Sequence, residues 1–341
     1  MSVITFKPKQ VTKSLLTTIP PRARDVIIGR FGLDENPERK TLESIGNTYG
    51  ITRERVRQIE NFALTSLKKS EAFEKAASAI EELRTILESL GGIMSEEDFL
   101  EHISPDKTIQ NHITLFLVLS DDFTKHKEDD TFKHRWSVND EMASEVHAVL
   151  HSLHKEFSDS DLIPEKEIIE RFLDRMHADP KRKNEHTAKR WLGISKVLGK
   201  NTLGDWGVAS SPNISARGIR DYAFLVIRRH GSPMHFTEVA KNISQTFGKK
   251  AHIATCHNEL IKDKRFVLVG RGLYVLSEWG YTGGVVKDVI RHVLEKEGPL
   301  TKTQIVEKVM KERYVKENTI LVNLQNAKYF KKDKEGKYHT I

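Results

Sequence analysis

Four aromatic residues, spaced 70, 68 and 64 residues apart, limit what this chain can fold into: Trp136, Trp206, Tyr274 and Tyr338. Each closes a stretch in which the sequence predicts a helix, a short strand, two helices and a strand pair. Self-similarity at a fixed period indicates an array of small units, each one supersecondary motif, rather than one large core. That order of elements is what a winged helix requires. The pattern therefore predicts three to four winged-helix units, of which the second copy follows the pattern least closely.

A shorter segment with a different pattern precedes the repeats, and the chain as a whole is expected to be mainly α-helical. Loop-forming residues and changes in periodicity separate the expected segments. These are a polar arm at 1–14, a helix-turn-helix at 15–70, winged-helix units at 76–138, 217–281 and 285–341, and a winged-helix-like unit at 144–209.

Composition narrows the class of protein. The formal net charge is +7 and the sequence contains one cysteine, Cys256. A basic balance favours polyanionic partners, and a single cysteine cannot form a disulfide within the chain. No apolar run approaches membrane-spanning length. We expect a cytoplasmic, nucleoid-associated protein with no membrane partner.

The helix-turn-helix is predicted from two short amphipathic helices and their boundaries. Thr41 begins the first helix and Gly50 ends it at a tight turn. Thr52 caps the second helix, in which Val56 and Ala63 belong to one buried face. Two short helices joined by a turn that contains glycine form the helix-turn-helix pattern.

The opposite face of the second helix carries side chains that can read base edges. Arg53, Glu54, Arg57 and Gln58 lie on it, in the half of the helix that enters a groove first. Arginine pairs with guanine, glutamine with adenine, and glutamate accepts from cytosine. The alternative is an ordinary solvated polar face. The preceding helix, the turn and the cap favour DNA reading.

Residues 15–69 resemble region 4 of the primary sigma factors. The resemblance rests on IPPRARDVIIGRFGL in the first half and on TLESIG, GITRERVRQIE and the following AL and LKK in the second. It implies base contacts with the promoter −35 element by Arg53, Glu54, Arg57 and Gln58. It implies phosphate contacts by Thr52, Arg55, Thr41 and Leu42. It also implies docking on the flap of the RNA polymerase β subunit through Val26, Ile27, Phe31, Gly32 and Leu33.

The resemblance covers about one sixth of the chain. In that family, the regions that bind the −10 element and melt DNA precede region 4, whereas 14 residues precede it here. Of the tryptophans, Trp191 alone is a candidate platform for an unstacked base. We therefore expect the protein to act beside a complete sigma factor rather than to initiate transcription alone.

A second resemblance covers residues 220–281. The segments GSPMHFTEVAKNI and DKRFVLVGRGLYVLSEWGY resemble HARE-HTH winged helices, a group that includes the N-terminal domain of the polymerase delta subunit. The third helix of this unit, within AHIATCHNELIKDK, is poor in arginine. That composition favours contact with protein rather than with DNA for this copy.

Other chemical constellations are weak. His147, His151 and His154 have a spacing that could hold a metal, but an ordinary helix face is the simpler interpretation. Cys256 and His257 lack a third partner for nucleophilic catalysis. The aromatics Trp136, Trp206 and Tyr274 fit a core better than base stacking. We predict no enzyme, metal, cofactor or small-molecule substrate.

The function predicted from the sequence is a DNA-binding transcription factor that contacts a −35-like element in double-stranded DNA and docks on RNA polymerase. Two alternatives stay open. One is an interaction scaffold or polymerase accessory subunit that does not read DNA sequence. The other is a specificity module of a restriction-modification system, since HARE-HTH units also occur there.

Overall fold

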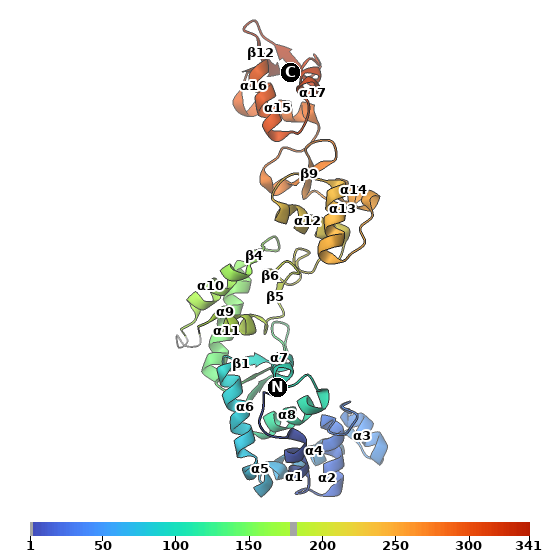
Figure 1. Ribbon diagram of the computed structural model, residues 1–341, viewed down its shortest axis with the longest axis vertical. Coiled ribbons are helices and arrows are strands. Elements are labelled where there is room, and N and C mark those ends of the chain that lie inside the picture. Colours follow the sequence, from blue (N-terminus) through green and yellow to red (C-terminus); the bar gives the residue numbers. More distant parts are fainter. Residues whose placement is uncertain (1–2, 178–182) are drawn as a thin grey trace. The chain divides into compact units, whose positions relative to one another are not determined.

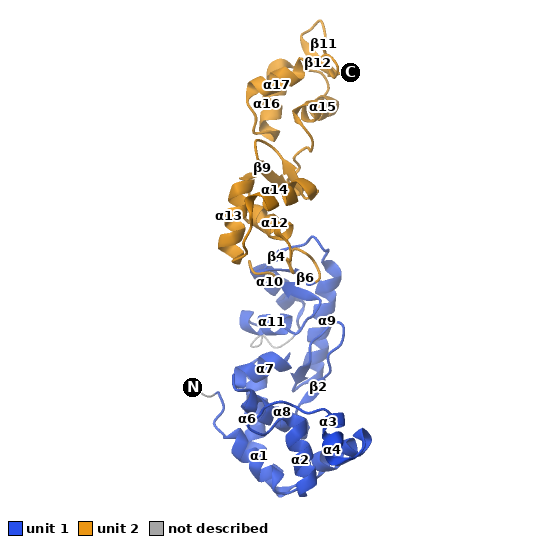
Figure 2. Ribbon diagram, turned by 90° about the vertical axis from the view of Figure 1, so that its right-hand side faces the viewer, with its two compact units in different colours: residues 1–200, 204–209 blue, residues 201–203, 210–341 orange. Residues whose placement is uncertain are grey.

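The computed structural model describes residues 3–177 and 183–341 (Figure 1). The fold is mainly helical with small antiparallel sheets, as the sequence predicts. Two compact units divide the chain, one of residues 1–200 and 204–209, the other of residues 201–203 and 210–341 (Figure 2). No helix among the described residues is both long and apolar enough to cross a bilayer.

The first unit begins with four helices: α1 (Pro8–Leu16), α2 (Pro21–Phe31), α3 (Leu42–Tyr49) and α4 (Arg53–Lys68). The expectation of a polar arm at 1–14 is wrong for the second half of that segment, because α1 begins at Pro8. Ile4 and Thr12 are 6% and 1% exposed. The helical spacing of Pro8, Thr12, Leu15 and Leu16 gives α1 a buried face, and a segment with such a face packs instead of extending into solvent.

Local chemistry fixes the turn between α3 and α4. The Thr41 and Thr52 hydroxyls accept hydrogen bonds from the backbone N–H groups of Ser44 and Arg55, at 3.1 and 3.2 Å. Gly50 ends α3 in the left-handed conformation, with φ of 64°. At Gly46, a Cβ atom would lie 2.6 Å from the carbonyl oxygen of Ile51, so the helices could not approach this closely with any other residue.

The first winged helix follows directly. Its elements are α5 (Glu71–Lys75), α6 (Ala77–Ser89), β1 (Ile93–Ser95), α7 (Glu96–Ile103), α8 (Lys107–Leu119), β2 (Thr124–His126) and β3 (Arg135–Ser137). The same unit then contains α9 (Asp140–Glu156), β4 (Ile163–Pro164), α10 (Glu165–Arg175), α11 (Glu185–Leu192), β5 (Leu198–Lys200) and β6 (Asp205–Val208). Phe132 and Ser195 form an isolated β-bridge between these two sets of elements.

The second unit repeats the arrangement twice. The first set is α12 (Ile219–His230), β7 (Met234–His235), α13 (Phe236–Phe247), α14 (Ile253–Lys262), β8 (Phe266–Leu268), β9 (Leu273–Leu276) and the 3-10 helix η2 (Ser277–Trp279). The second set is α15 (Val286–Glu297), β10 (Leu300–Thr301), α16 (Lys302–Glu312), α17 (Glu317–Leu324), β11 (Phe330–Lys332) and β12 (Lys337–Thr340).

Within residues 3–177 and 183–341, four sheets share one topology, which explains the periodic aromatics. Their strand orders are β1-β3-β2, β4-β6-β5, β7-β9-β8 and β10-β12-β11, so the last strand of each set lies in the middle. The four aromatics occupy that middle strand, each opposite an apolar residue of the first strand. The pairs are Met94 with Trp136, Ile163 with Trp206, Met234 with Tyr274 and Leu300 with Tyr338. The sequence period is thus the recurrence of one register position.

The helix-turn-helix has two apolar faces with different partners. Its small inner core contains Val26, Ile45 and Val56. A second face belongs to a much larger core that extends through α6, α7 and α8 of the first winged helix. The members of that face from α1, α2 and α4 are Leu15, Leu16, Ala23, Ile27, Phe31, Ala63 and Leu67. The helix-turn-helix and the first winged helix are therefore built around a common core.

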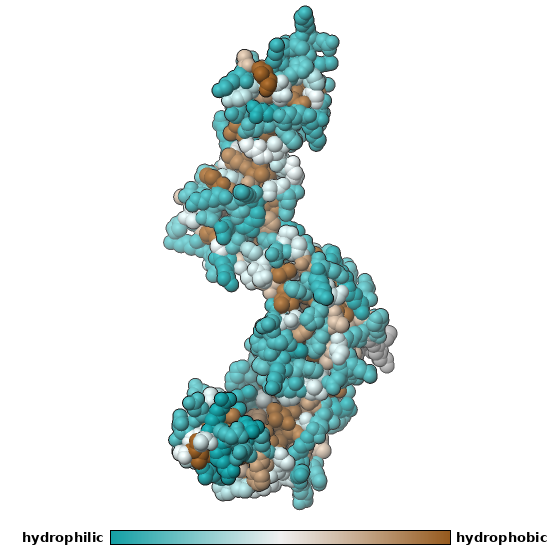
Figure 3. Space-filling view, turned by 180° about the vertical axis from the view of Figure 1, so that it is seen from behind, coloured by the Kyte–Doolittle hydropathy of each residue, from teal (hydrophilic) through white to brown (hydrophobic). Residues whose placement is uncertain are grey.

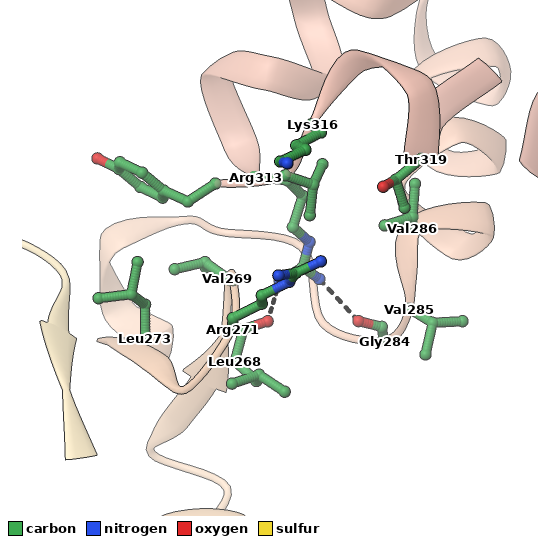
Figure 4. Close-up of a pocket in the computed structure, with 13 residues that line it drawn as sticks. Leu268, Val269, Arg271, Leu273, Gly284, Val285, Val286, Arg313, Lys316 and Thr319 are labelled. Atoms are coloured by element: carbon green, nitrogen blue, oxygen red, sulfur yellow. Dashed lines mark hydrogen bonds between the residues drawn. The ribbon is translucent and has the colours of Figure 1, made fainter. Parts of the chain in front are cut away.

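A buried arginine joins the two sets of elements in the second unit (Figure 4). Arg313, 3% exposed, donates hydrogen bonds to the carbonyl oxygens of Thr282 and Gly284 at 2.6 and 2.8 Å, and also to that of Leu268. The Tyr314 N–H donates to the Val269 carbonyl at 2.7 Å. Beside Arg313 lies a cavity of about 520 Å³. These bonds hold the hairpin of β8 and β9 against the segment that follows α16.

Candidate nucleic-acid interface

Helix α4 presents one apolar and one polar face. Val56, Ala63 and Leu67 are fully buried. On the other side, every residue expected to contact bases or phosphate from this helix and its cap is exposed: Thr52, Arg53, Glu54, Arg55, Arg57 and Gln58. The structure thus places these six side chains together on one accessible surface.

The two positions expected to contact phosphate from the start of α3 lie differently. Thr41 is exposed, and its hydroxyl is already engaged as the helix cap. Leu42 is half-buried and packs against the inner core. Its available donor is the backbone N–H in the first turn of α3, where four N–H groups have no partner within the helix. Such N–H groups favour anions.

Ion pairing orders the exposed face of α4. The Glu54 carboxylate accepts from Nε and Nη2 of Arg57 at 2.9 and 2.7 Å. This hydrogen bonding lowers the pKa of Glu54 and raises the pKa of Arg57. Arg55 Nη1 donates to Gln58 Oε1 at 3.1 Å.

The Glu54 pair leaves part of the Arg57 guanidinium free. An arginine carries five N–H donors, and Glu54 uses two of them along the Nε–Nη2 edge. The outer Nη1–Nη2 edge still offers two parallel donors, the geometry that guanine O6 and N7 accept. Glu54 therefore stiffens the side chain of Arg57 without blocking bidentate contact with a base.

The residues expected to dock on polymerase are divided between the two apolar faces of the helix-turn-helix: Val26 lies in the inner core, and Ile27, Phe31 and Leu33 lie on the face covered by the first winged helix. Val26 and Ile27 are fully buried and Phe31 is 8% exposed. Leu33 is half-buried and packs against the large core. Gly32 ends α2 with φ of 63°, and a Cβ atom there would lie 2.6 Å from the Pro37 carbonyl oxygen. All five residues thus have structural roles in the chain's own fold.

Helix α8 packs against the helix-turn-helix face that belongs to the large core, and its residues Ile113, Phe116 and Leu117 are almost completely buried. Its polar residues bind the loop that follows α2. Asn111 Nδ2 donates to the carbonyl oxygens of Gly32 and Pro37, both at 2.9 Å. Arg39 in that loop donates back to Asn111 Oδ1 and Thr114 Oγ1, both at 3.0 Å.

Sequence reasoning missed this role of α8, although a signal was present. The segment ITLFLVL, residues 113–119, is apolar on nearly every side of the helix. A helix that is apolar all round is buried on all sides, so α8 needed a partner beyond its own three-helix unit.

The weaker constellations have structural explanations. His147 Nε2 accepts from Arg135 Nε at 2.7 Å, and burial lowers its pKa to about 4. No cluster of three or more His, Cys, Asp or Glu side chains suited to a metal occurs in the described residues. Burial raises the pKa of Cys256 to about 11, which disfavours the thiolate. Trp191 is fully buried and stacks on Phe172, so it offers no surface to a base.

Two family models match the chain. That of sigma-70 region 4 matches residues 15–69, and that of HARE-HTH, a helix-turn-helix domain named in part after restriction endonucleases, matches residues 219–279. Both resemblances noted in the sequence are therefore confirmed.

Curated relatives match between 16% and 22% of the chain. The RNA polymerase principal sigma factor HrdD of Streptomyces coelicolor is 42% identical over 79 residues, which cover 22% of this chain and 24% of HrdD. The RNA polymerase sigma factor SigA1 of Synechococcus elongatus is 50% identical over 56 residues, 16% of this chain and 14% of SigA1. RpoD of Neisseria gonorrhoeae is 46% identical over 59 residues, 17% of this chain and 9% of RpoD. The chain thus spans less than a quarter of these relatives' length.

Proposed function

We propose that this protein is a DNA-binding transcription factor that reads a −35-like promoter element through α4 and associates with bacterial RNA polymerase. The observation that carries the proposal is the exposed face of Arg53, Glu54, Arg57 and Gln58, on a stretch that resembles sigma region 4. The side-chain types, their place near the N-terminus of α4 and their accessibility all suit insertion into a major groove.

Selection of bound sequences from random duplex DNA, followed by affinity measurements, tests the proposal. Arg57→Ala should cost about 1–3 kcal/mol on the selected site and relax the preference at one base position. Arg84→Ala is a matched control, because Arg84 makes the same bidentate pair with Glu81, three residues earlier on α6. If Arg57→Ala and Arg84→Ala each weaken binding to the selected site and binding to random DNA by the same factor, α4 does not read bases.

Association with polymerase has a structural condition. Val26, one of the five expected positions, lies in the inner core of the helix-turn-helix. To contact the other four, Ile27, Phe31, Gly32 and Leu33, the β flap would have to displace α8 from the face that α8 now covers. We infer that α8 and the flap compete for this face. A contact with polymerase made while α8 stays in place would use another surface.

The flap competition is testable with a purified flap fragment. Asn111→Ala removes the bonds of Asn111 to the loop after α2, leaving that of Arg39 to Thr114, without opening a large hole in the core. This variant should bind the fragment more tightly than the unaltered protein does. Equal affinities would show that α8 is not the barrier. Absence of polymerase from a pull-down with the unaltered protein would contradict the association itself.

A second candidate function, a protein-interaction scaffold, is favoured by α14. Ile253 and Ile261 on this helix are 52% and 62% exposed, and no arginine lies within it. A third helix that presents apolar side chains fits a protein surface better than a phosphate backbone. Substitution of both isoleucines by serine should then weaken a protein contact and leave DNA affinity unchanged.

A further inference from the structure

The C-terminal segment holds most of the chain's surplus positive charge. Residues 285–341 contain thirteen lysines and arginines against eight aspartates and glutamates, a surplus of five out of the net +7. The face of this segment that Figure 3 shows is mostly hydrophilic. Surface charge of one sign concentrates counterions of the other sign.

Three of these cations converge on one aromatic ring. Lys287 Nζ lies 4.6 Å, Arg291 Cζ 5.7 Å and Lys328 Nζ 5.9 Å from the centroid of the Tyr329 ring. Lys287 and Arg291 are one turn apart on α15, whereas Lys328 precedes β11. We name these four residues the Tyr329 cluster.

In the described part of the chain, the cations of the Tyr329 cluster form no ion pair. Over residues 3–177 and 183–341, no carboxylate lies within 4.0 Å of the charged groups of Lys287, Arg291 or Lys328. Other lysines of the same segment are paired: Lys308 with Glu297 and Lys311 with Glu307. Cations held near one ring repel one another, and a bound anion would relieve that repulsion.

The cluster extends along the neighbouring strand. Lys331 and Lys332 on β11 are exposed, and Lys332 Nζ lies 6.0 Å from the centroid of the Tyr338 ring. A row of cations that continues from the half-buried Lys287 and Arg291 on a helix to exposed lysines on a strand suits a repeating anion better than a single one. A phosphodiester backbone is such an anion, with one charge at each nucleotide.

The third helix of this segment is poorly suited to reading sequence. Helix α17 has the sequence ENTILVNL, which contains no lysine or arginine. Its exposed residues include Asn318, Thr319 and Val322. Contact through the Tyr329 cluster would therefore engage phosphates rather than base edges.

We infer that the Tyr329 cluster, with Lys331 and Lys332, is a second nucleic-acid contact that binds the backbone of duplex DNA without regard to sequence. The choice of duplex DNA rests on the proposed function of α4. The contact itself rests on the charges of the C-terminal segment.

Salt-dependent binding of the full chain to a random 25-base-pair duplex tests the inference. The variant Lys287→Gln, Arg291→Gln, Lys328→Gln should reduce the slope of log affinity against log salt by about 3 and weaken binding at least roughly tenfold at low salt. The control variant Lys308→Gln, Lys311→Gln, Lys337→Gln removes the same charge from ion-paired positions. It should retain most of the slope.

Equal slopes for the two triple variants would overturn the inference, as would tighter binding of single-stranded RNA or of polyaspartate than of the duplex. The pair Lys287→Arg, Lys328→Arg keeps the charge and should keep the slope. In an Arg57→Ala background, the two triple variants should still differ in slope, because the Tyr329 cluster acts on the backbone independently of α4. Failure of the α4 proposal, seen on selected sites, is therefore distinguishable from failure at the Tyr329 cluster.

Discussion

Substitution of Phe116 tests whether the helix-turn-helix and the first winged helix unfold together. Phe116 is 1% exposed on α8, and its ring centroid lies 6.1 Å from that of Phe6. Phe116→Ala should lower the free energy of unfolding by about 3–5 kcal/mol, the range for a phenylalanine removed from a packed core. Domain stabilities are about 5–15 kcal/mol, so this single change is a large part of the total.

Hydrogen exchange followed by mass spectrometry locates the effect. Because α8 shares a core with α1, α2 and α4, protection should fall in α2 and α4 as well as in α6 and α7. Val118→Ala is the matched control, since Val118 lies on the same helix and is 37% exposed. It should change stability by about 0.5 kcal/mol or less. Unchanged protection in α2 and α4 of the Phe116 variant would refute the common core.

Three further changes probe other parts of the structure. Gly46→Ala should destabilise the helix-turn-helix by about 1–3 kcal/mol and weaken DNA binding, because the added methyl would meet a backbone oxygen at 2.6 Å. Urea unfolding measures the loss of stability, and DNA titration measures the loss of affinity. Burial, with a smaller effect from Lys9, lowers the pKa of His112 to about 4. Because the folded state then binds fewer protons than the unfolded state, the free energy of unfolding should fall as the pH is lowered from 6.5 to 4. That loss is at most about 3 kcal/mol and should shrink in His112→Gln. Arg313→Met should expose the loop at 282–285 to proteolysis, whereas Arg271→Ala, an exposed neighbour, should not.

The sequence predicted best where a local rule decides the structure. Hydroxyl caps at Thr41 and Thr52 and the left-handed Gly50 depend on a few adjacent residues, so the position of α4 and its exposed face could be inferred without coordinates. The position of the periodic aromatics in each unit was equally predictable from the sequence, because the strand residue opposite a buried apolar partner is apolar in every copy.

Contacts between residues far apart in the sequence could not be predicted in the same way. Asn111 and His112 look like solvent-exposed polar residues of an amphipathic helix, yet both are buried. Their partners, Gly32 and Thr12, lie 79 and 100 residues away. A buried amide or imidazole is tolerated only where such a partner exists. The burial of Ile27 and Phe31 has the same origin, because periodicity shows that a face is apolar without showing what covers it.

The third helices of the winged-helix repeats have diverged in what they contact, and this divergence bears on how DNA would be bound. Helix α8 is buried against the helix-turn-helix, and α14 exposes isoleucines. On α11, Lys189 is paired with Glu165 and Glu185. Helix α17 contains no cation. Among the described residues, none of these helices presents the unpaired arginine-rich face that base reading requires. Under the proposed function, sequence discrimination therefore belongs to α4, and the repeats contribute through packing, protein contact or the backbone-binding cluster around Tyr329.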